Sequence, residues 1–257
     1  MRCNYHTHTT RCKHAVGEDR EYVECAVRRG LKVLGFSDHT PYPFPDGYVS
    51  SCRMALDEME GYVRSVLTLK EEYASQIEIH LGLETEYYPA CWEALLRFLE
   101  DYPVEYMILG QHAVDNEMGA AYSGHPTDDP VILDKYVNQV IAGMQTGRFM
   151  YVAHPDVINF TGDEALYEQQ MRRLCREAIR LDIPMEINFL GIWDGRDYPS
   201  ERFWKLAGEE GVRAVYGVDA HIPDRLLDLE QERIAESIRT RYGLDLIEDP
   251  FAYRNHR

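Results

Sequence analysis

Two histidines near the amino terminus are the first residues whose spacing suggests chemistry. His6 and His8 are separated only by Thr7. On an extended strand, alternate side chains point to the same face, so the two imidazoles would lie side by side. Neutral histidine nitrogens bind zinc and similar divalent metals readily. The pair alone is weak evidence, so the positions of the other histidines and carboxylates decide whether it belongs to a metal site.

Further candidate ligands fall at, or just past, the carboxyl ends of segments that read as strands. They are His14, His39, Glu84, His112, His154, Asp219 and His221. Histidine with carboxylate suits zinc, manganese or iron. The nine residues exceed what one tetrahedral ion needs and a carboxylate can bridge two ions, so we expect two or three divalent ions. Such a cluster would lower the pKa of a bound water to about 7 and would neutralise an anionic substrate such as a phosphate monoester.

Short apolar runs alternate with amphipathic segments along the chain. We expect strands over 3–7, 32–37, 77–83, 106–110, 149–153, 183–187 and 212–217, and helices over 18–30, 52–73, 92–99, 131–144, 164–181, 200–208 and 225–242. This alternation predicts an α/β fold with a parallel sheet. A closed barrel of seven strand–helix units is our first interpretation and an open doubly wound sheet is the second, because periodicity does not distinguish them. In α/β barrels the active site lies at the carboxyl ends of the strands, where the candidate ligands fall.

Composition limits the classes of partner. The chain has 257 residues, 45% of them hydrophobic, and no linker or internal repeat that would divide it, so we expect one domain over residues 1–257. The net charge of −17 disfavours a nucleic-acid partner. No apolar run approaches the roughly 18 residues that a membrane span needs.

The amino terminus and the cysteines indicate the compartment. The first residues lead directly to His6 without an apolar signal region, so we do not expect export. The six cysteines include no Cys-x-x-Cys pair, which favours reduced thiols and a cytoplasmic protein. Cys12 is the cysteine to watch, because it lies near the candidate ligands.

The order of the motifs resembles that of one known family. The motifs are His6-Thr7-His8, Cys12-Lys13-His14, Ser37-Asp38-His39, Gly82-Leu83-Glu84, Gly110-Gln111-His112, Ala153-His154-Pro155-Asp156 and Gly217-Val218-Asp219-Ala220-His221. Together they resemble the PHP (polymerase and histidinol phosphatase) family, and most of all its histidinol-phosphatase branch. The resemblance extends from Cys3 to about His221. It implies a distorted, TIM-like, seven-stranded barrel that holds a trinuclear metal centre.

The resemblance also implies ligand sets and a reaction. It implies that one ion is held by His6, His8, Glu84 and Asp219, a second by His14, His39 and His221, and a third by His112 and His154, with Glu84 as a bridge. The implied activity is that of a phosphomonoesterase in which a metal-bridging hydroxide attacks phosphorus in line. L-histidinol phosphate is the leading substrate. Among the ligands, we assign catalytic roles to His39, Glu84 and Asp219.

The residues around the ligands carry further expectations. Ligating histidines are usually oriented by a carboxylate, so we expect Asp38 to support His39 and Asp156 to orient His154. The family's phosphate-binding basic residues follow the His-x-Asp motif and the sixth strand, where this chain has none; Arg196 is the nearest base. We therefore expect Arg196 to bind the substrate phosphate, with Trp193 as a flat surface for an imidazole or a base.

Three other functions are compatible with the same residues. One is a phosphoesterase that acts on a different small phosphate, such as a nucleotide. Another is an amidohydrolase-like enzyme that hydrolyses C–N or C–O bonds. The third is a regulatory or polymerase-associated module without activity, which the acidic composition, the short chain and the intact ligand set disfavour.

Overall fold

The computed structural model describes residues 1–255, which divide into two compact units. Unit 1 comprises Met1–Thr85, Pro89–Ile108 and Gly217–Leu229. Unit 2 comprises Glu86–Tyr88, Leu109–Tyr216 and the chain from Glu230 onward. Each unit is described separately below.

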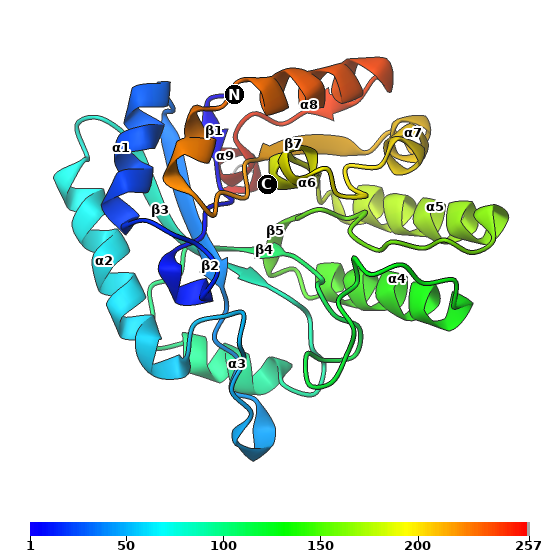
Figure 1. Cartoon of the computed structure of the whole chain (residues 1–257), viewed down its shortest axis with the longest axis horizontal. Coiled ribbons are helices and arrows are strands. Elements are labelled where there is room, and N and C mark those ends of the chain that lie inside the picture. The colour runs from blue at the N-terminus through cyan, green and yellow to red at the C-terminus, as the bar shows by residue number, and fades with distance from the viewer. Residues whose placement is uncertain (256–257) are drawn as a thin grey trace. The chain divides into compact units, whose positions relative to one another are not determined.

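Unit 1 contains the amino-terminal strands and helices. They are β1 (Cys3–Asn4), α1 (Asp19–Arg29), β2 (Val33–His39), α2 (Met59–Glu72), β3 (Glu78–Thr85), α3 (Trp92–Leu99) and β4 (Tyr106–Leu109), with 3₁₀ turns η1 (Thr10–Cys12), η2 (Pro45–Gly47), η3 (Leu56–Glu58) and η4 (Pro223–Leu227). The strands follow the order β1-β2-β3-β4, and the first two pairings are parallel. Helices α1 and α2 lie side by side, and α2 packs on β3 (Figure 1).

The register between β2 and β3 determines which of their residues meet at the candidate site. All seven residues of β2 are buried, as expected for a parallel strand covered on both faces. In the parallel ladder His39 lies opposite Glu84, each near the carboxyl end of its strand. The two side chains are therefore delivered to one edge of the sheet, as the sequence predicts.

One tyrosine explains two glycines in these strands. The Tyr106 hydroxyl donates a shared hydrogen bond to the carbonyl oxygens of Tyr5 and Phe36, 2.9 Å from each. A Cβ atom at Gly35 would lie 2.2 Å from that hydroxyl, and one at Gly82 would lie 2.3 Å from the Tyr106 ring. A side chain at either position would displace the tyrosine, so glycine is needed where the ring crosses both strands.

Unit 2 contains the carboxy-terminal strands and helices. They are α4 (Pro130–Gln145), β5 (Phe149–Val152), α5 (Glu164–Leu181), β6 (Met185–Asn188), α6 (Phe189–Asp194), α7 (Glu201–Glu210), β7 (Arg213–Gly217), α8 (Glu230–Arg241), β8 (Asp245–Leu246) and α9 (Pro250–Asn255). The strands follow the order β5-β6-β7-β8, with parallel pairing of β5 to β6 and of β7 to β8. Helix α5 packs between α4 and α7 (Figure 1).

The predicted α/β class with parallel strands is confirmed, and a strand lies in each of the seven predicted ranges. The first is shorter than the predicted 3–7: beyond it Thr7 forms an isolated parallel bridge to Ala220, and the connecting backbone is held by the side chain of Asn4. Its amide donates to His6 O and Thr7 Oγ1, and its oxygen accepts from Val218 N. The structure also contains the two-residue strand β8, which the periodicity did not reveal.

Three predictions of local structure need correction. The range 52–73 is not one helix, because residues 52–55 are not helical, the 3₁₀ turn η3 covers Leu56–Glu58 and α2 begins at Met59. The range 225–242 is not one helix, because the 3₁₀ turn η4 ends at Leu227 and α8 begins at Glu230. The stretch after the sixth strand, for which no helix was predicted, forms helix α6. Asn188 begins this helix by accepting a hydrogen bond from Gly191 N, and Gly195, at φ 63°, ends it.

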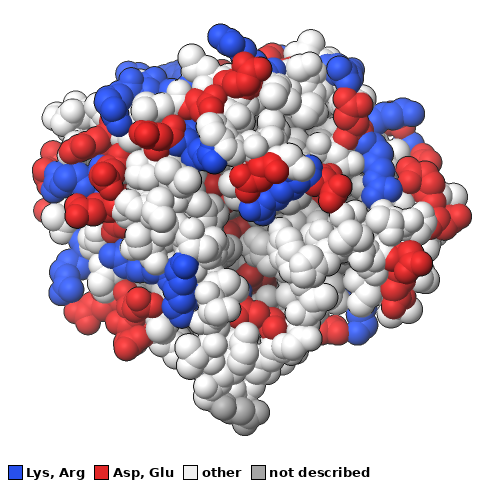
Figure 2. Space-filling model, in the orientation of Figure 1, with Lys and Arg blue, Asp and Glu red and all other residues white. Residues whose placement is uncertain are grey.

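Acidic and basic side chains are interspersed over the face drawn in Figure 2. Some charged residues of the protein form networks: the Arg172 guanidinium contacts carboxylates of Glu168, Glu209 and Glu210 at 2.5–2.9 Å. Exposed pairs of this kind contribute little each to stability. Across residues 1–255, no helix combines the length and the apolar character needed to cross a bilayer.

Candidate metal centre

Four predicted ligands of unit 1 converge in its interior. His6 Nε2 lies 3.5 Å from Glu84 Oε2 and 3.4 Å from Asp219 Oδ1. His8 Nε2 lies 3.4 Å and 3.1 Å from the same two oxygens. All four side chains are at least 95% buried. The residues that the resemblance assigns to one ion are thus brought together.

The spacing of these atoms fits a shared cation. Metal bonds of about 2.0–2.1 Å in tetrahedral geometry separate neighbouring ligand atoms by roughly 3.4 Å. The nitrogen-to-oxygen distances of 3.1–3.5 Å match that separation. Two buried carboxylates also carry charge that needs a positive partner, because an uncompensated buried charge is costly. The donor set therefore suits a divalent metal ion.

A second group in unit 1 consists of His14, His39 and His221, whose ligand atoms lie within 4.8 Å of one another. His14 Nε2 and His221 Nε2 face each other at 3.0 Å. Each ring places Nδ1 near a backbone carbonyl oxygen, that of Cys12 at 2.7 Å and that of Asp219 at 3.1 Å. A carbonyl oxygen only accepts, so both Nδ1 atoms carry the proton.

This tautomer leaves a lone pair on each of the two facing Nε2 atoms. Burial is the largest cause that lowers the pKa of both rings, to about 3 for His221, so both are neutral at neutral pH. Two lone pairs at 3.0 Å repel, and a cation bound between them removes the repulsion. His39 Nδ1, 3.1 Å from Glu84 Oε2, connects this group to the first. Both groups therefore fit metal binding.

The local backbone directs these side chains. The turn η1 ends at Lys13, which has φ 70°, and this left-handed residue reverses the chain between Cys12 and His14. Asp219 also has a positive φ, 53°. Non-glycine residues in this region store strain that persists where the surrounding structure enforces it, often at functional sites. The strain at Asp219 is consistent with its place in the ligand cluster.

Asp38 contacts the ring of His8 and the backbone of His39. Its Oδ1 lies 3.4 Å from His8 Nδ1, and the same oxygen accepts the backbone N–H of His39 at 2.8 Å. Oδ2 accepts a short hydrogen bond from Thr9 Oγ1. Adjacent residues of a strand point to opposite faces, so the Asp38 side chain is directed away from the His39 ring. The carboxylate therefore orients the imidazole of His8.

Two neighbouring carboxylates make the imidazole of His8 basic. Burial disfavours the imidazolium, but hydrogen bonds to Asp219 and Asp38 outweigh burial and raise the pKa of His8 to about 9. A divalent cation on Nε2 would replace that proton, because metal ligands bind in their deprotonated form. Metal binding at this position is thus expected to release a proton.

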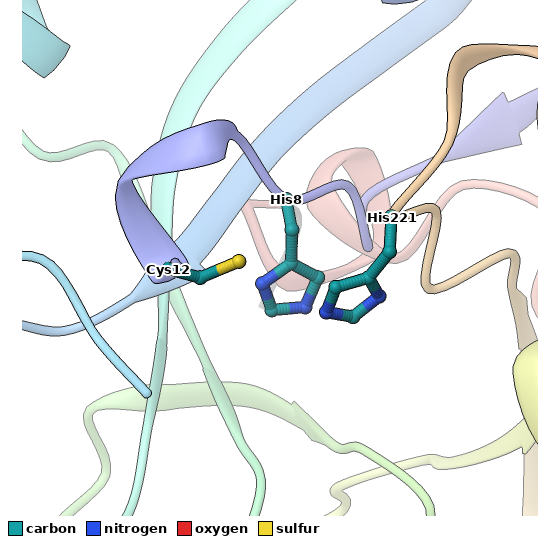
Figure 3. A group of neighbouring side chains, drawn as sticks. All are labelled: His8, Cys12 and His221. Carbon is teal, nitrogen blue, oxygen red and sulfur yellow. The ribbon is translucent and has the colours of Figure 1, made fainter. Parts of the chain in front are cut away.

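Cys12 is the residue of unit 1 that the ligand prediction did not include. Its sulfur is directed toward the His8 ring, with His221 beyond it (Figure 3). The side chain is fully buried, and burial, with the nearby charge of Asp38, raises the pKa of the thiol to about 12. The sequence motif gave its proximity to His14, but only the fold places it beside His8 and His221.

Two predicted ligands, His112 and His154, belong to unit 2. Their ring centroids lie 4.9 Å apart. His112 Nδ1 is 2.9 Å from Glu86 Oε1, so Glu86 orients this imidazole. The backbone N–H of His154, a residue with φ 29°, donates to Glu186 Oε2. The sequence analysis did not include Glu186, a fully buried residue of β6. Its position near the carboxyl end of a predicted strand is the sequence signal that could have identified it.

The described hydrogen bond of Asp156 is to a backbone group. Its Oδ2 accepts the backbone N–H of Ser200, the residue before α7, at 2.6 Å. Burial raises the pKa of Asp156 to about 7. Its described contact thus fixes the start of α7, and an orienting role toward His154 stays a prediction.

The two predicted substrate residues lie at the end of α6 in unit 2. The Arg196 guanidinium pairs with Asp194 at 2.9 Å and donates to the Tyr198 hydroxyl at 2.9 Å. The Tyr198 ring lies 5.7 Å from that of His154. Trp193 is 41% exposed. Arg196 is thus one tyrosine away from a predicted ligand, and its guanidinium is paired with Asp194.

Comparison with known proteins identifies relatives of this chain. The family model described as "PHP domain" matches residues 4–189. Histidinol-phosphatase from Bacillus subtilis is 33% identical over 246 residues, which cover 84% of this chain and 92% of that protein. A probable histidinol-phosphatase from Deinococcus radiodurans is 29% identical over 234 residues, or 86% of each chain.

Solved structures share the fold. The crystal structure of histidinol phosphate phosphatase from Lactococcus lactis, in complex with zinc, L-histidinol and phosphate, superposes with a TM-score of 0.74, 19% identity and coverage of 96% of this chain and 95% of that one. The putative histidinol phosphatase from Listeria monocytogenes gives a TM-score of 0.72 at 20% identity, covering 87% and 96%. At these identities the likeness establishes the fold.

Proposed function

This chain belongs to the PHP family, and from that premise we propose that it is a metal-dependent phosphatase that hydrolyses the phosphate monoester of L-histidinol. The observation that carries the proposal is the cluster of five histidines and two carboxylates in unit 1, with spacings that suit divalent ions. The substrate is supported by the relatives named histidinol-phosphatase, which align over most of their length. The reaction class is phosphoric monoester hydrolysis.

The proposed architecture follows from the family. The chain would form a distorted seven-stranded barrel in one PHP-type domain over residues 1–257. The seven predicted strands and the structural likeness to histidinol phosphate phosphatase support this architecture. The short β8 would then lie outside the barrel proper.

The proposed metal content is two or three ions of zinc, manganese or iron. His6, His8, Glu84 and Asp219 would hold one ion, and His14, His39 and His221 would hold a second; the distances within unit 1 support both sets. A third ion on His112 and His154, with Glu84 as a bridge, rests on the family's motif order alone.

The proposed mechanism assigns a task to each group. When bound, the ions would neutralise the phosphate and lower the pKa of a water that attacks phosphorus in line. Glu84 and Asp219 supply the negative charge that holds the ions, and His39 contributes a ligand nitrogen beside Glu84. Asp38 fixes the ring of His8, so that its Nε2 is directed to the ions. No phosphorylated residue is required.

The substrate would be held by unit 2 residues. Arg196 would exchange Asp194 for the phosphate, because a guanidinium forms paired, charge-assisted hydrogen bonds to phosphate oxygens. The exposed ring of Trp193 would offer a face to the imidazole of histidinol. These two assignments rest on position in the sequence and on the exposure of α6.

The proposed setting is the cytoplasm, and the proposed partner is a small phosphate ester. All six cysteines are free thiols, as is usual in a reducing compartment. The excess of acidic residues is unfavourable for binding nucleic acid.

A panel of substrates tests the proposal. Phosphate release is measured for L-histidinol phosphate, a nucleoside monophosphate and a sugar phosphate, with the His6→Asn variant as a control for contaminating phosphatases. We expect the highest kcat/KM for L-histidinol phosphate and loss of activity in the variant. A preference for the nucleotide would make the protein a different phosphoesterase. Turnover of none of the esters, with hydrolysis of amide substrates, would contradict the phosphatase assignment.

A further inference from the structure

Three side chains beside the candidate metal centre form a ligand group that neither proposed ion uses as a set. Cys12 Sγ and one ring nitrogen each from His8 and His221 all lie within 4.8 Å of one another. The two imidazole rings stack with centroids 4.1 Å apart, and the sulfur is directed toward the His8 ring (Figure 3). We propose that these residues form a separate site for a soft, thiophilic ion such as Cd²⁺, which competes with the ions that the enzyme uses.

The sulfur is held in place by local structure. The 3₁₀ turn η1 places Cys12 one turn after Thr9, whose carbonyl oxygen accepts the Cys12 N–H at 3.1 Å. The left-handed Lys13 then turns the chain so that the N–H of Ala15 donates to Cys12 Sγ at 3.2 Å. This bond stabilises negative charge on the sulfur in part, while burial keeps the Cys12 thiol protonated until a cation replaces the proton. The ligand atom is therefore positioned before any ion arrives.

The chemistry of the group favours soft ions. Thiolate ligands select soft metals, whereas Mn²⁺ prefers oxygen. In the binding step the S–H bond breaks, a sulfur–cadmium bond forms and the proton passes to solvent, without change of oxidation state. Bonds of about 2.3 Å to sulfur and 2.0–2.1 Å to nitrogen, as for zinc, separate these atoms by roughly 3.6 Å, so the ion draws the three side chains slightly together.

Occupation of this site would deprive both proposed ions of a ligand. His8 also belongs to the group with His6 and Asp219, and His221 also belongs to the group with His14 and His39. A nitrogen lone pair serves one ion at a time. His8 and His221 are shared in this way, so a thiophilic ion on Cys12 competes with each proposed ion wherever both need the same ring nitrogen. We therefore expect it to inhibit by displacing native metal rather than by blocking substrate.

The test is a titration of the enzyme, loaded with its native metals, with Cd²⁺. The exposed Cys52 is first replaced by serine to remove background. Ultraviolet absorption from cadmium–thiolate charge transfer reports binding, and elemental analysis after gel filtration reports displaced native ions. Cys12→Ser is compared with Cys175→Ser as the matched control. Cys175 is as buried as Cys12, but it lies on α5 in unit 2.

We expect the parent and Cys175→Ser to develop the absorption and lose native metal together, whereas Cys12→Ser does neither at the same Cd²⁺ concentration. Uninhibited activity should be alike in all three. The proposal is overturned if Cys12→Ser shows the full absorption, or if the parent shows none. Should Cys12→Ser fold poorly, Cys12→Ala serves the same comparison. Because the main readout is spectroscopic, the outcome does not depend on which substrate the enzyme hydrolyses.

Discussion

Replacing Asp38 by asparagine isolates the contribution of a single buried charge to metal binding. Asp38 is fully buried, and its carboxylate lies 3.4 Å from His8 Nδ1. Loss of such a partner of a metal ligand typically lowers metal affinity 10–100-fold, or about 1.4–2.7 kcal/mol. The distance is long for a charge-assisted hydrogen bond, so the lower end applies. Asparagine can still accept from the backbone of His39, so the fold should be retained.

The assay for Asp38→Asn is zinc affinity, measured by competition with a chelator at neutral pH. We expect a decrease of about tenfold, together with a higher metal concentration for half-maximal activity. Asp19→Asn is the control: Asp19 is also buried in unit 1 but accepts from Arg11 at 2.9 Å and from Ser65. It should lower stability and leave zinc affinity unchanged. Parental affinity in Asp38→Asn, or an equal loss in both variants, would refute the reasoning.

Three further predictions concern charge. Glu84→Gln should reduce phosphate release far more than Glu86→Gln, because Glu84 contacts three histidines of unit 1 whereas Glu86 contacts His112; equal losses would remove Glu84 from its bridging role. Arg196→Ala should lower kcat/KM roughly tenfold or more while the metal content stays unchanged. If the variant has the same kcat/KM as the parent protein, another residue binds the phosphate. For Glu105, burial is outweighed by hydrogen bonds from His80 and Lys70, so its pKa is lowered from 4.5 to about 2. The ionised carboxylate therefore adds to the free energy of unfolding above pH 4.5, and this contribution is lost as the pH falls toward 2. In urea unfolding, Glu105→Gln should lower the free energy of unfolding by about 1 kcal/mol at pH 7 and by much less at pH 3. An equal decrease at both pH values would contradict the assignment.

The sequence carried most of the information about which residues meet in unit 1. His39 and Glu84 end two neighbouring parallel strands, and parallel register alone brings them opposite each other. The family's motif order supplied the two groupings around them. Side-chain direction was the missing step for Asp38, because alternation along β2 turns its carboxylate away from the His39 ring.

Other features depended on contacts that a linear pattern does not encode. The place of Cys12 beside His8 and His221 follows from a 3₁₀ turn and a left-handed lysine, which no hydrophobic period marks. The short helix α6 depends on the side-chain amide of Asn188, whose oxygen accepts a hydrogen bond from Gly191 N. In both cases local backbone conformation and hydrogen bonding, and not the hydrophobic pattern, decided the structure.

The most direct test of the central claim is to count metal ions and phosphate release on the same sample. The purified protein is analysed for zinc, manganese and iron, assayed with L-histidinol phosphate, stripped with a chelator and reconstituted. The account predicts two or three ions per chain, loss of phosphate release when they are removed, and its return when they are restored. Undiminished hydrolysis of L-histidinol phosphate by a sample shown to hold no metal would contradict the account.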